Sequence, residues 1–163
     1  MSLNASVSLD ARALPRGLRN NNPCNLRPSG IAWQGLAGAD TAGGQGAYLR
    51  FASLAFGLRA GAKVLISYQK NHGIRTLVGV FRRWAPGSDG NDPAAYAGFV
   101  AQELGVDPEA EIEIATAPTL IALLRAIVRM ENGPPPEGQA QWIDDATLAT
   151  GVQLALACSP PCS

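Results

Sequence analysis

The spacing of apolar residues changes at Leu54 from short alternating segments to helical periodicity. From this residue on, apolar positions recur every three or four residues, which predicts a first helix running to about residue 70. One later helix has a clear start signal at Asp92-Pro93, an N-cap followed by proline at the first helical position. The same periodicity predicts further helices over residues 76–84, 92–104, 116–130 and 145–157.

Before Leu54 the pattern is that of loops and short strands. Tyr48-Leu-Arg-Phe51 alternates as a strand does, so segments 31–35 and 46–51 are predicted to pair as a small hairpin. Residues 37–46 contain four glycines and are expected to form a flexible turn. Together these patterns predict a mostly helical α+β fold, with one domain over residues 15–157 between a flexible leader (1–14) and a tail (158–163).

Composition narrows the class of protein further. A chain of 163 residues with 47% hydrophobic content can bury one real core. Thirteen basic and thirteen acidic residues give a net charge of zero, so we expect no nucleic-acid partner and no attraction to an anionic membrane. The apolar runs are too short for a membrane span. The first fourteen residues lack a signal peptide, which predicts synthesis in the bacterial cytoplasm and exit only by a dedicated route.

The chain has three cysteines and one histidine, which is a poor set for a metal site. Cys158 and Cys162 flank Ser-Pro-Pro in the tail, where they could close a small loop. We therefore expect neither a metal nor another cofactor.

Residues 16–27 contain four asparagines and three arginines, together with Gly17 and Pro23. Asparagine competes with the backbone for hydrogen bonds and proline removes a donor, so this Asn-rich loop is expected to be ordered but neither helix nor strand. Side-chain amides that face outward suit a ligand rich in hydroxyl and N-acetyl groups, such as a glycan. The plainer alternative is a turn that only caps the next element.

Glu131 is the candidate catalytic residue. It lies at the end of the apolar helix predicted over 116–130, where Asn132-Gly133 breaks the periodicity. The carbonyl end of a helix and partial burial both disfavour a negative charge there, which favours the protonated acid. Cleavage of a glycosidic bond needs such an acid to protonate the leaving oxygen. The alternative is an ordinary solvated residue at a helix end.

Four aromatic side chains could stack on sugar rings. Trp33 and Tyr96 lie beside predicted loops and are the better candidates, whereas Tyr48 lies on a predicted strand. Trp84 shares one helical face with Phe81, which favours packing in the core.

Cys24 and His72 form the alternative catalytic pair. A thiol nucleophile and an imidazole base, with Asn71 or an asparagine of the Asn-rich loop as orienter, would make a peptidase or amidase site. Two features weaken this pair. The residues around Cys24 do not predict a helix start that would lower the thiol's pKa, and His72 lies in an Asn-His-Gly helix stop, where it can cap the last carbonyls.

Seven motifs follow one another along residues 16–133: Arg16–Leu26, Trp33-Gln-Gly35, Arg50-Phe-Ala-Ser53, Gly57-Leu-Arg-Ala60, Trp84-Ala-Pro86, Asn91-Asp92 with Tyr96, and Glu131-Asn-Gly133. In this order they resemble a phage-derived family described as virion or structural proteins. Two departures from its pattern are Cys24, where the family has glycine, and Met130, where it has histidine. The first departure implies that Cys24 is dispensable.

A fainter similarity links the chain to lysozyme-like glucosaminidases and lytic transglycosylases, whose catalytic helix ends in Glu-Ser-Gly. Their later motifs occur here in the same order, but the helix ending at Glu131 comes last instead of first. We therefore hypothesise a circular permutation of a lysozyme-like domain. The resemblance implies that Glu131 lies beside the Asn-rich loop, with a sugar site shaped by Asn21, Asn22, Asn25, Trp33 and Tyr96.

Three functions are compatible with these features. The first is an antibacterial enzyme that cleaves the glycan strands of peptidoglycan, as a lysozyme-type hydrolase or lytic transglycosylase, with Glu131 as acid and base. The second is a non-catalytic virion or cell-wall-binding protein, and the third is a peptidoglycan amidase using Cys24 and His72. All three imply bacterial peptidoglycan as the partner, with virion proteins or an inhibitor (immunity) protein as further partners. The site of action would be the periplasm or cell wall, reached directly or in a virion.

Overall fold

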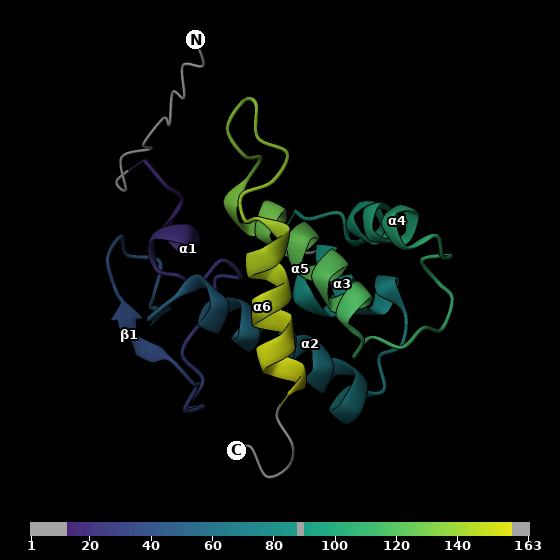
Figure 1. Cartoon of the computed structure of the whole chain (residues 1–163), viewed down its shortest axis with the longest axis horizontal. Helices are drawn as coiled ribbons and strands as arrows, with labels where there is room; N and C mark the ends of the chain where they lie inside the picture. Colours follow the sequence, from purple (N-terminus) through teal and green to yellow (C-terminus); the bar gives the residue numbers. More distant parts are fainter. Residues whose placement is uncertain (1–12, 88–89, 158–163) are drawn as a thin grey trace.

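The computed structural model describes residues 13–87 and 90–157, which form a group of helices with a small hairpin at one side (Figure 1). The predicted α+β, mostly helical class is confirmed. The tail with Cys158 and Cys162, and nearly all of the predicted leader, lie outside the described residues. In chain order the elements are α1 (Arg16–Arg19), β1 (Leu36–Asp40), β2 (Tyr48–Phe51), α2 (Leu54–His72), α3 (Leu77–Trp84), α4 (Pro93–Leu104), α5 (Ala117–Asn132) and α6 (Asp145–Leu156).

The long helices start where the sequence places their caps. The side chains of Ser53, Thr76, Asp92 and Asp144 each accept a hydrogen bond from a backbone N–H in the first turn of α2, α3, α4 and α6. The main difference lies in α5, which continues past residue 130 and ends at Asn132. Glu131 is therefore inside the last helical turn, and its backbone direction is fixed by the helix.

The hairpin exists, but its first strand is not the predicted one. β1 pairs antiparallel with β2, with Leu36 opposite Phe51 and Asp40 opposite Tyr48, and a bulge interrupts the ladder between Leu36 and Gly38. The strand thus occupies part of the segment predicted as a glycine-rich turn. Nearly all of its side chains are exposed. Because exposed positions need no apolar alternation, β1 carries no strand signal in its sequence.

The Asn-rich loop begins with one turn of helix, contrary to the prediction of an irregular segment throughout. The backbone N–H groups of Arg19 and Asn20 donate to the carbonyls of Pro15 and Arg16, which closes α1. Beyond α1 the segment is irregular as predicted. Asn21 and Asn25 both have φ of 51°, a left-handed conformation that asparagine tolerates better than most residues.

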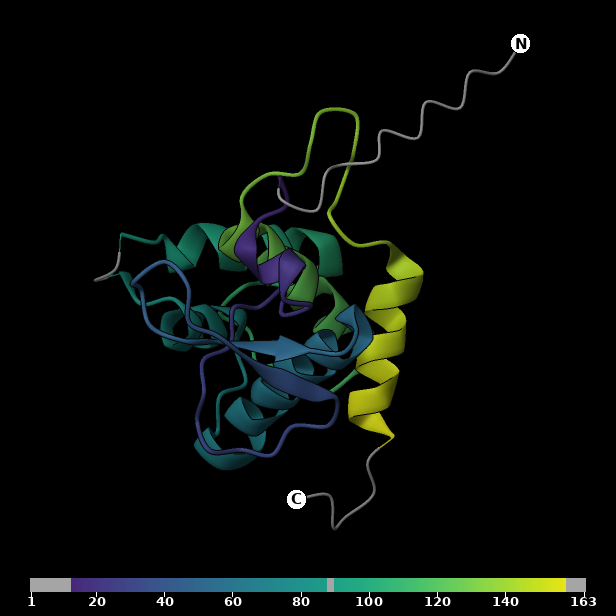
Figure 2. The ribbon, with the colours of Figure 1, turned by 90° about the vertical axis from the view of Figure 1, so that its left-hand side faces the viewer.

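Helix α2 is closely packed on two sides, through its own glycines on one side and a glycine of α6 on the other. The Asn-rich loop lies against one side: a Cβ at Gly57 would be 1.9 Å from the carbonyl oxygen of Asn21, and one at Gly61 would be 2.6 Å from Cys24 Sγ. Helix α6 lies along the other side, where Gly151 allows contact with Leu58. Figures 1 and 2 show α6, in yellow, running alongside α2.

Candidate functional site

Glu131 lies where three distant segments meet. Its Oε1 accepts a hydrogen bond of 3.1 Å from Nε1 of Trp84, the last residue of α3. Its Oε2 accepts a hydrogen bond of 3.1 Å from Nδ2 of Asn25 in the Asn-rich loop. The same amide nitrogen lies 3.3 Å from the backbone carbonyl oxygen of Glu131. The carboxylate is half-buried and held at both oxygens by neutral donors.

The residue after Glu131 ties the end of α5 to the same loop. Nδ2 of Asn132 donates to the carbonyl oxygen of Pro23 and to that of Val128, both at 2.8 Å. The Oδ1 atoms of Asn25 and Asn132 are buried and accept no hydrogen bond. Both oxygens face Gly17, where a Cβ would lie 2.7 and 2.6 Å from them. Only glycine fits there, and its Cα–H groups can make weak contacts with the two oxygens.

The remaining asparagines of the loop have structural roles. Asn22 has an exposed fraction of 0%, and its Nδ2 donates to the carbonyls of Leu26 and Leu49 at 2.9 Å. It has no exposed surface for a ligand, which argues against the predicted contact between Asn22 and a sugar. Asn21 is half-buried and donates to the carbonyl of Phe51 at 3.1 Å. Of the three predicted asparagines, Asn25 alone contacts Glu131 in the described part of the chain.

An ion pair fixes α1 to β1 beside this loop. Nε of Arg16 lies 2.8 Å from Oδ2 of Asp40, which also accepts a 3.0 Å hydrogen bond from Asn20. The Arg16 guanidinium and the Asn20 amide hold the pKa of Asp40 well below its usual range. The guanidinium carbons of Arg16 and Arg27 lie 4.4 and 4.3 Å from the ring centre of Tyr48. Two guanidinium groups therefore cover the Tyr48 ring, which disfavours stacking of a sugar on it.

The two predicted sugar-stacking aromatics lie in different parts of the fold. Trp33 is half-buried and packs against the small hydrophobic cluster of Leu49, Phe51 and Ala60. Tyr96 lies on α4, where its ring stacks on Phe81 with a centre-to-centre distance of 5.8 Å. The structure thus does not join Trp33 and Tyr96 in one hydrophobic cluster.

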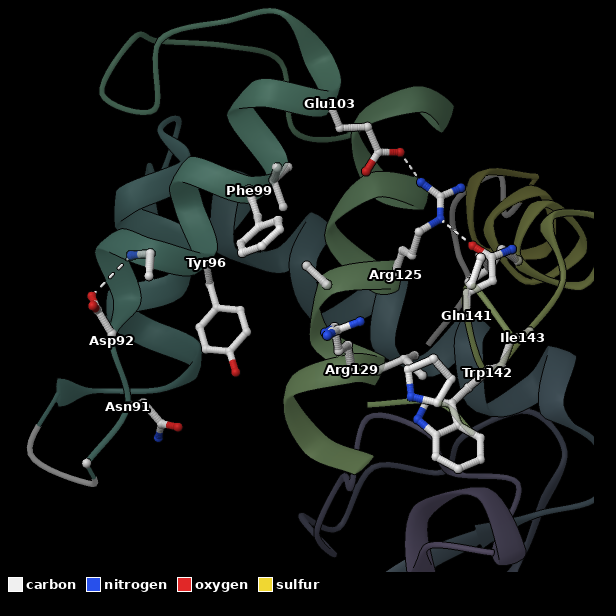
Figure 3. Close-up of a pocket in the computed structure, with 18 residues that line it drawn as sticks. Asn91, Asp92, Tyr96, Phe99, Glu103, Arg125, Arg129, Gln141, Trp142 and Ile143 are labelled. Atoms are coloured by element: carbon white, nitrogen blue, oxygen red, sulfur yellow. Dashed lines mark hydrogen bonds and ion pairs between the residues drawn. The ribbon is translucent and has the colours of Figure 1, made fainter. Parts of the chain in front are cut away.

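Tyr96 lines a cavity of about 620 Å³ between α4, α5 and the segment 135–143 (Figure 3). Glu131 is not among its lining residues. Glu131 follows Arg129, which does line the cavity, by two residues on α5. The side chains of Glu131 and Arg129 therefore point about 200° apart around the helix axis. The cavity and the Glu131 carboxylate therefore flank the same helix end. The polar and aromatic residues that line the cavity include Asn91, Tyr96, Phe99, Arg129, Gln141 and Trp142.

Trp84 is the site residue that sequence reasoning missed, because its helical spacing with Phe81 indicated the core. It does pack at the edge of the core, with its ring centre 6.2 Å from that of Tyr68. A partly buried tryptophan also needs an acceptor for its indole N–H, and the chain offers few carboxylates near helix ends. That requirement was the available signal for pairing Trp84 with Glu131.

The pairing of Cys24 with His72 is wrong. Cys24 has an exposed fraction of 2% and packs against Gly61, near the middle of α2. His72 ends the same helix eleven residues later, about 16 Å further along its axis. There its ring nitrogen lies 3.2 Å from Nη2 of Arg83. Burial, reinforced by the negative charge of Glu131, raises the pKa of the Cys24 thiol, so the nucleophilic thiolate is disfavoured.

The Cys24 thiol should react slowly with a disulfide reagent at pH 8 while the protein is folded, and rapidly after unfolding in urea. A Cys158→Ser, Cys162→Ser background isolates its signal. Its pKa is raised in the folded state above the ordinary 9.0, so the unfolded chain loses the proton first as the pH rises. The Cys24 contribution to stability is therefore complete below pH 9 and declines above it. Fast labelling of the folded protein would contradict this burial.

Two broader features complete the description. Among residues 13–87 and 90–157, no helix is both long and apolar enough to cross a membrane. The same residues contain no group of three or more His, Cys, Asp or Glu side chains that could hold a metal ion.

Comparison with known proteins places the chain among phage proteins. No model of a protein family matches the sequence. Protein P5 of Pseudoalteromonas phage PM2 is 35% identical over 124 residues, and the alignment covers 74% of this chain and 73% of the phage protein. This identity extends over most of both chains. The chain therefore belongs to the family of protein P5 of Pseudoalteromonas phage PM2.

Proposed function

We propose that this phage-related protein cleaves the glycan strands of bacterial peptidoglycan, with Glu131 as general acid and then as base. The observation that carries the proposal is the fixed Glu131 carboxylate. Trp84 and Asn25 hold one oxygen each, and the half-buried side chain leaves room for a ligand to approach. A carboxylate oxygen has two acceptor positions, so each can keep its internal hydrogen bond and still meet a substrate hydroxyl.

The proposed reaction uses one carboxyl group twice. Protonated Glu131 gives its proton to the glycosidic oxygen as the bond from that oxygen to the sugar C1 breaks. The C6 hydroxyl of the same sugar then attacks C1 and returns a proton to Glu131. The products are a free hydroxyl on one fragment and an internal anhydro ring on the other. In the hydrolytic variant, water takes the place of the C6 hydroxyl.

The surroundings of Glu131 favour the variant without water. Its hydrogen-bond partners in the described part of the chain, Trp84 and Asn25, are neutral donors. Most glycosidases place a second carboxylate beside the acid to act as nucleophile or to activate water. A site with a single carboxylate suits a reaction in which the substrate supplies its own nucleophile.

The phage relationship supports the same proposal from the biological side. A phage must cross the peptidoglycan layer of its host when the genome enters and when progeny leave. Membership of the P5 family supports an association with the virion. We propose peptidoglycan as the substrate, and the periplasm or cell wall as the place where it is met.

The direct test is incubation of the purified wild-type protein with purified peptidoglycan sacculi, followed by mass analysis of the soluble products. Glycan cleavage releases muropeptides with intact peptides, and anhydro ends identify the transglycosylase variant. Peptide fragments separated from the sugars would contradict the proposal. If no soluble products appear at any pH between about 4 and 9, the enzymatic proposal fails and the non-catalytic binding function remains.

Replacing Trp84 by Phe removes the indole donor but keeps an aromatic ring in place. The Glu131 carboxylate then loses one of its two side-chain donors and is positioned less well. We expect the rate of muropeptide release to fall about 10–100-fold, since a hydrogen bond to a charged group contributes about 1.5–3 kcal/mol. Phe81→Leu is the matched control for core packing. An unchanged rate in folded Trp84→Phe would show that the indole does not position Glu131.

A non-catalytic binding protein is the second candidate. The aromatic cavity favours it, because Glu131 is absent from the lining of that cavity. Under this function the protein sediments with sacculi without releasing fragments, and Glu131→Gln leaves sedimentation unchanged.

A further inference from the structure

The cavity between α4 and α5 contains one arginine that is neutralised and one that is not. Nε of Arg125 donates to Gln141 at 2.8 Å, Nη2 lies 2.9 Å from Oδ1 of Asp145, and Nη1 pairs with Glu103. Arg129 follows one turn later on the same face of α5. Within the part of the chain that the structure describes, it makes no hydrogen bond or ion pair. Arg129 is exposed and presents an unpaired guanidinium to the cavity, whose lining also includes the carboxylates of Asp92 and Glu103.

The walls around Arg129 are aromatic. Figure 3 shows Arg129 directed across the cavity toward Tyr96, with Phe99 above and Trp142 on the opposite wall. Phe99 has an exposed fraction of 72%, which is unusual for so large an apolar side chain. Trp142 is fixed by a 2.8 Å hydrogen bond from its Nε1 to the carbonyl oxygen of Gly133. Apolar side chains complete the lining, among them Val100, Ile143 and Leu148.

These features define the complementary ligand. A guanidinium without an internal partner attracts a carboxylate, which it can bind through two parallel hydrogen bonds. Exposed aromatic rings favour apolar groups close to that carboxylate. A position near the end of α5 alone would explain a basic residue, because cations are favourable there, but it would not explain the surrounding aromatic rings.

We propose that this cavity binds the stem peptide of peptidoglycan. Arg129 pairs with a carboxylate of the peptide, while Phe99 and Trp142 contact its methyl groups. The choice of ligand rests on the proposed function, since the stem peptide is the part of peptidoglycan that joins carboxylates to small apolar side chains.

A continuous set of contacts connects this cavity with Glu131. Tyr96 lines the cavity and stacks on Phe81, and Trp84 follows Phe81 by three residues on the same face of α3. Trp84 in turn donates to Glu131. A glycan held at Glu131 would lie on the opposite side of the α5 end from Arg129, and the peptide that branches from the sugar would pass around that end to enter the cavity. The cavity would make the protein prefer strands that still carry peptides.

The test is titration calorimetry of the full-length protein with a synthetic stem peptide. In this peptide the third residue is lysine and the glutamate is amidated, so that the terminal D-alanine carries the only carboxylate. Arg129→Gln should weaken its binding about 10–100-fold, as expected for loss of a charged hydrogen-bonded pair. The C-terminal amide of the peptide should bind wild type as weakly as the acid binds Arg129→Gln. Arg82→Gln, an exposed arginine outside the cavity lining, is the matched control and should bind like wild type.

Three results would overturn the inference: no binding of the peptide to wild type, equal binding of acid and amide, or displacement by a chito-oligosaccharide without peptide. Muropeptide release measured on the same preparations separates the two proposals. Release without peptide binding would refute the stem-peptide cavity and leave the glycan-cleaving function. Peptide binding without release would refute the enzyme and keep the cavity.

Discussion

Replacing Glu131 by Gln is expected to remove muropeptide release almost completely. An amide has nearly the shape of the carboxylic acid but cannot give a proton to the glycosidic oxygen. General acid catalysis is typically worth about 10²–10⁴-fold, so the loss should be of that order. The measurement is the initial rate of release from purified sacculi, followed by mass analysis.

The structure also predicts a side effect of this substitution. Both partners of the carboxylate, Trp84 and Asn25, are hydrogen-bond donors. The nitrogen of the introduced amide would face one of them, so we expect a loss of about 1–3 kcal/mol in the free energy of unfolding. Thermal unfolding separates this from the catalytic effect. Glu137→Gln, in the exposed segment just beyond α5, is the matched control and should remain active. A folded Glu131→Gln protein with wild-type rates would refute the role of Glu131.

Replacing Gly57 by Ala is expected to destabilise the fold. Alanine normally strengthens a helix by about 1 kcal/mol relative to glycine. Here the added Cβ would lie 1.9 Å from the carbonyl oxygen of Asn21, a backbone atom that cannot rotate away. Either α2 or the Asn-rich loop must shift, and such overpacking costs about 1–3 kcal/mol. We expect a net loss of free energy of unfolding in urea.

Gly98→Ala is the control for helix propensity. Gly98 lies within α4, and a Cβ there would meet no atom within 4 Å. This variant should therefore gain about 0.4–1 kcal/mol. A stabilised Gly57→Ala protein would contradict the close contact between α2 and the loop. Since that loop carries Asn25, Gly57→Ala should also reduce muropeptide release, whereas Gly98→Ala should not.

The helices could be predicted because their signals are local. Apolar spacing marks α2, α3 and α5, and Asp92-Pro93 marks the start of α4. Strand β1 could not be predicted, because it is exposed and held by backbone pairing with β2. The helical turn Arg16–Arg19 was not predicted for a related reason. Its composition favours a loop, and it is stabilised by tertiary contacts that the local sequence does not reveal.

The candidate site was predictable in part. The position of Glu131 at a helix end followed from Asn132-Gly133, and its place beside the Asn-rich loop followed from the motif order. The sequence could not predict which of the neighbouring asparagines donates a hydrogen bond to the Glu131 carboxylate. The left-handed turns at Asn21 and Asn25 decide which amides point inward, and Asn22 proves to be a core residue. The hydrogen bond from Trp84 to Glu131 could not be predicted either, because it depends on where the end of α3 lies relative to the end of α5.

The hydrogen bonds that complete the site have a consequence for the timing of synthesis. Asn25 and Glu131 are 106 residues apart in the chain, and Pro23 and Asn132 are 109 apart. At a translation rate of about 5–20 residues per second, the Asn-rich loop leaves the ribosome roughly 5–20 s before its partners. During this interval the nascent chain carries no assembled carboxylate site. Premature termination before α5 would therefore yield a fragment that lacks Glu131 and Asn132, the partners of the Asn-rich loop.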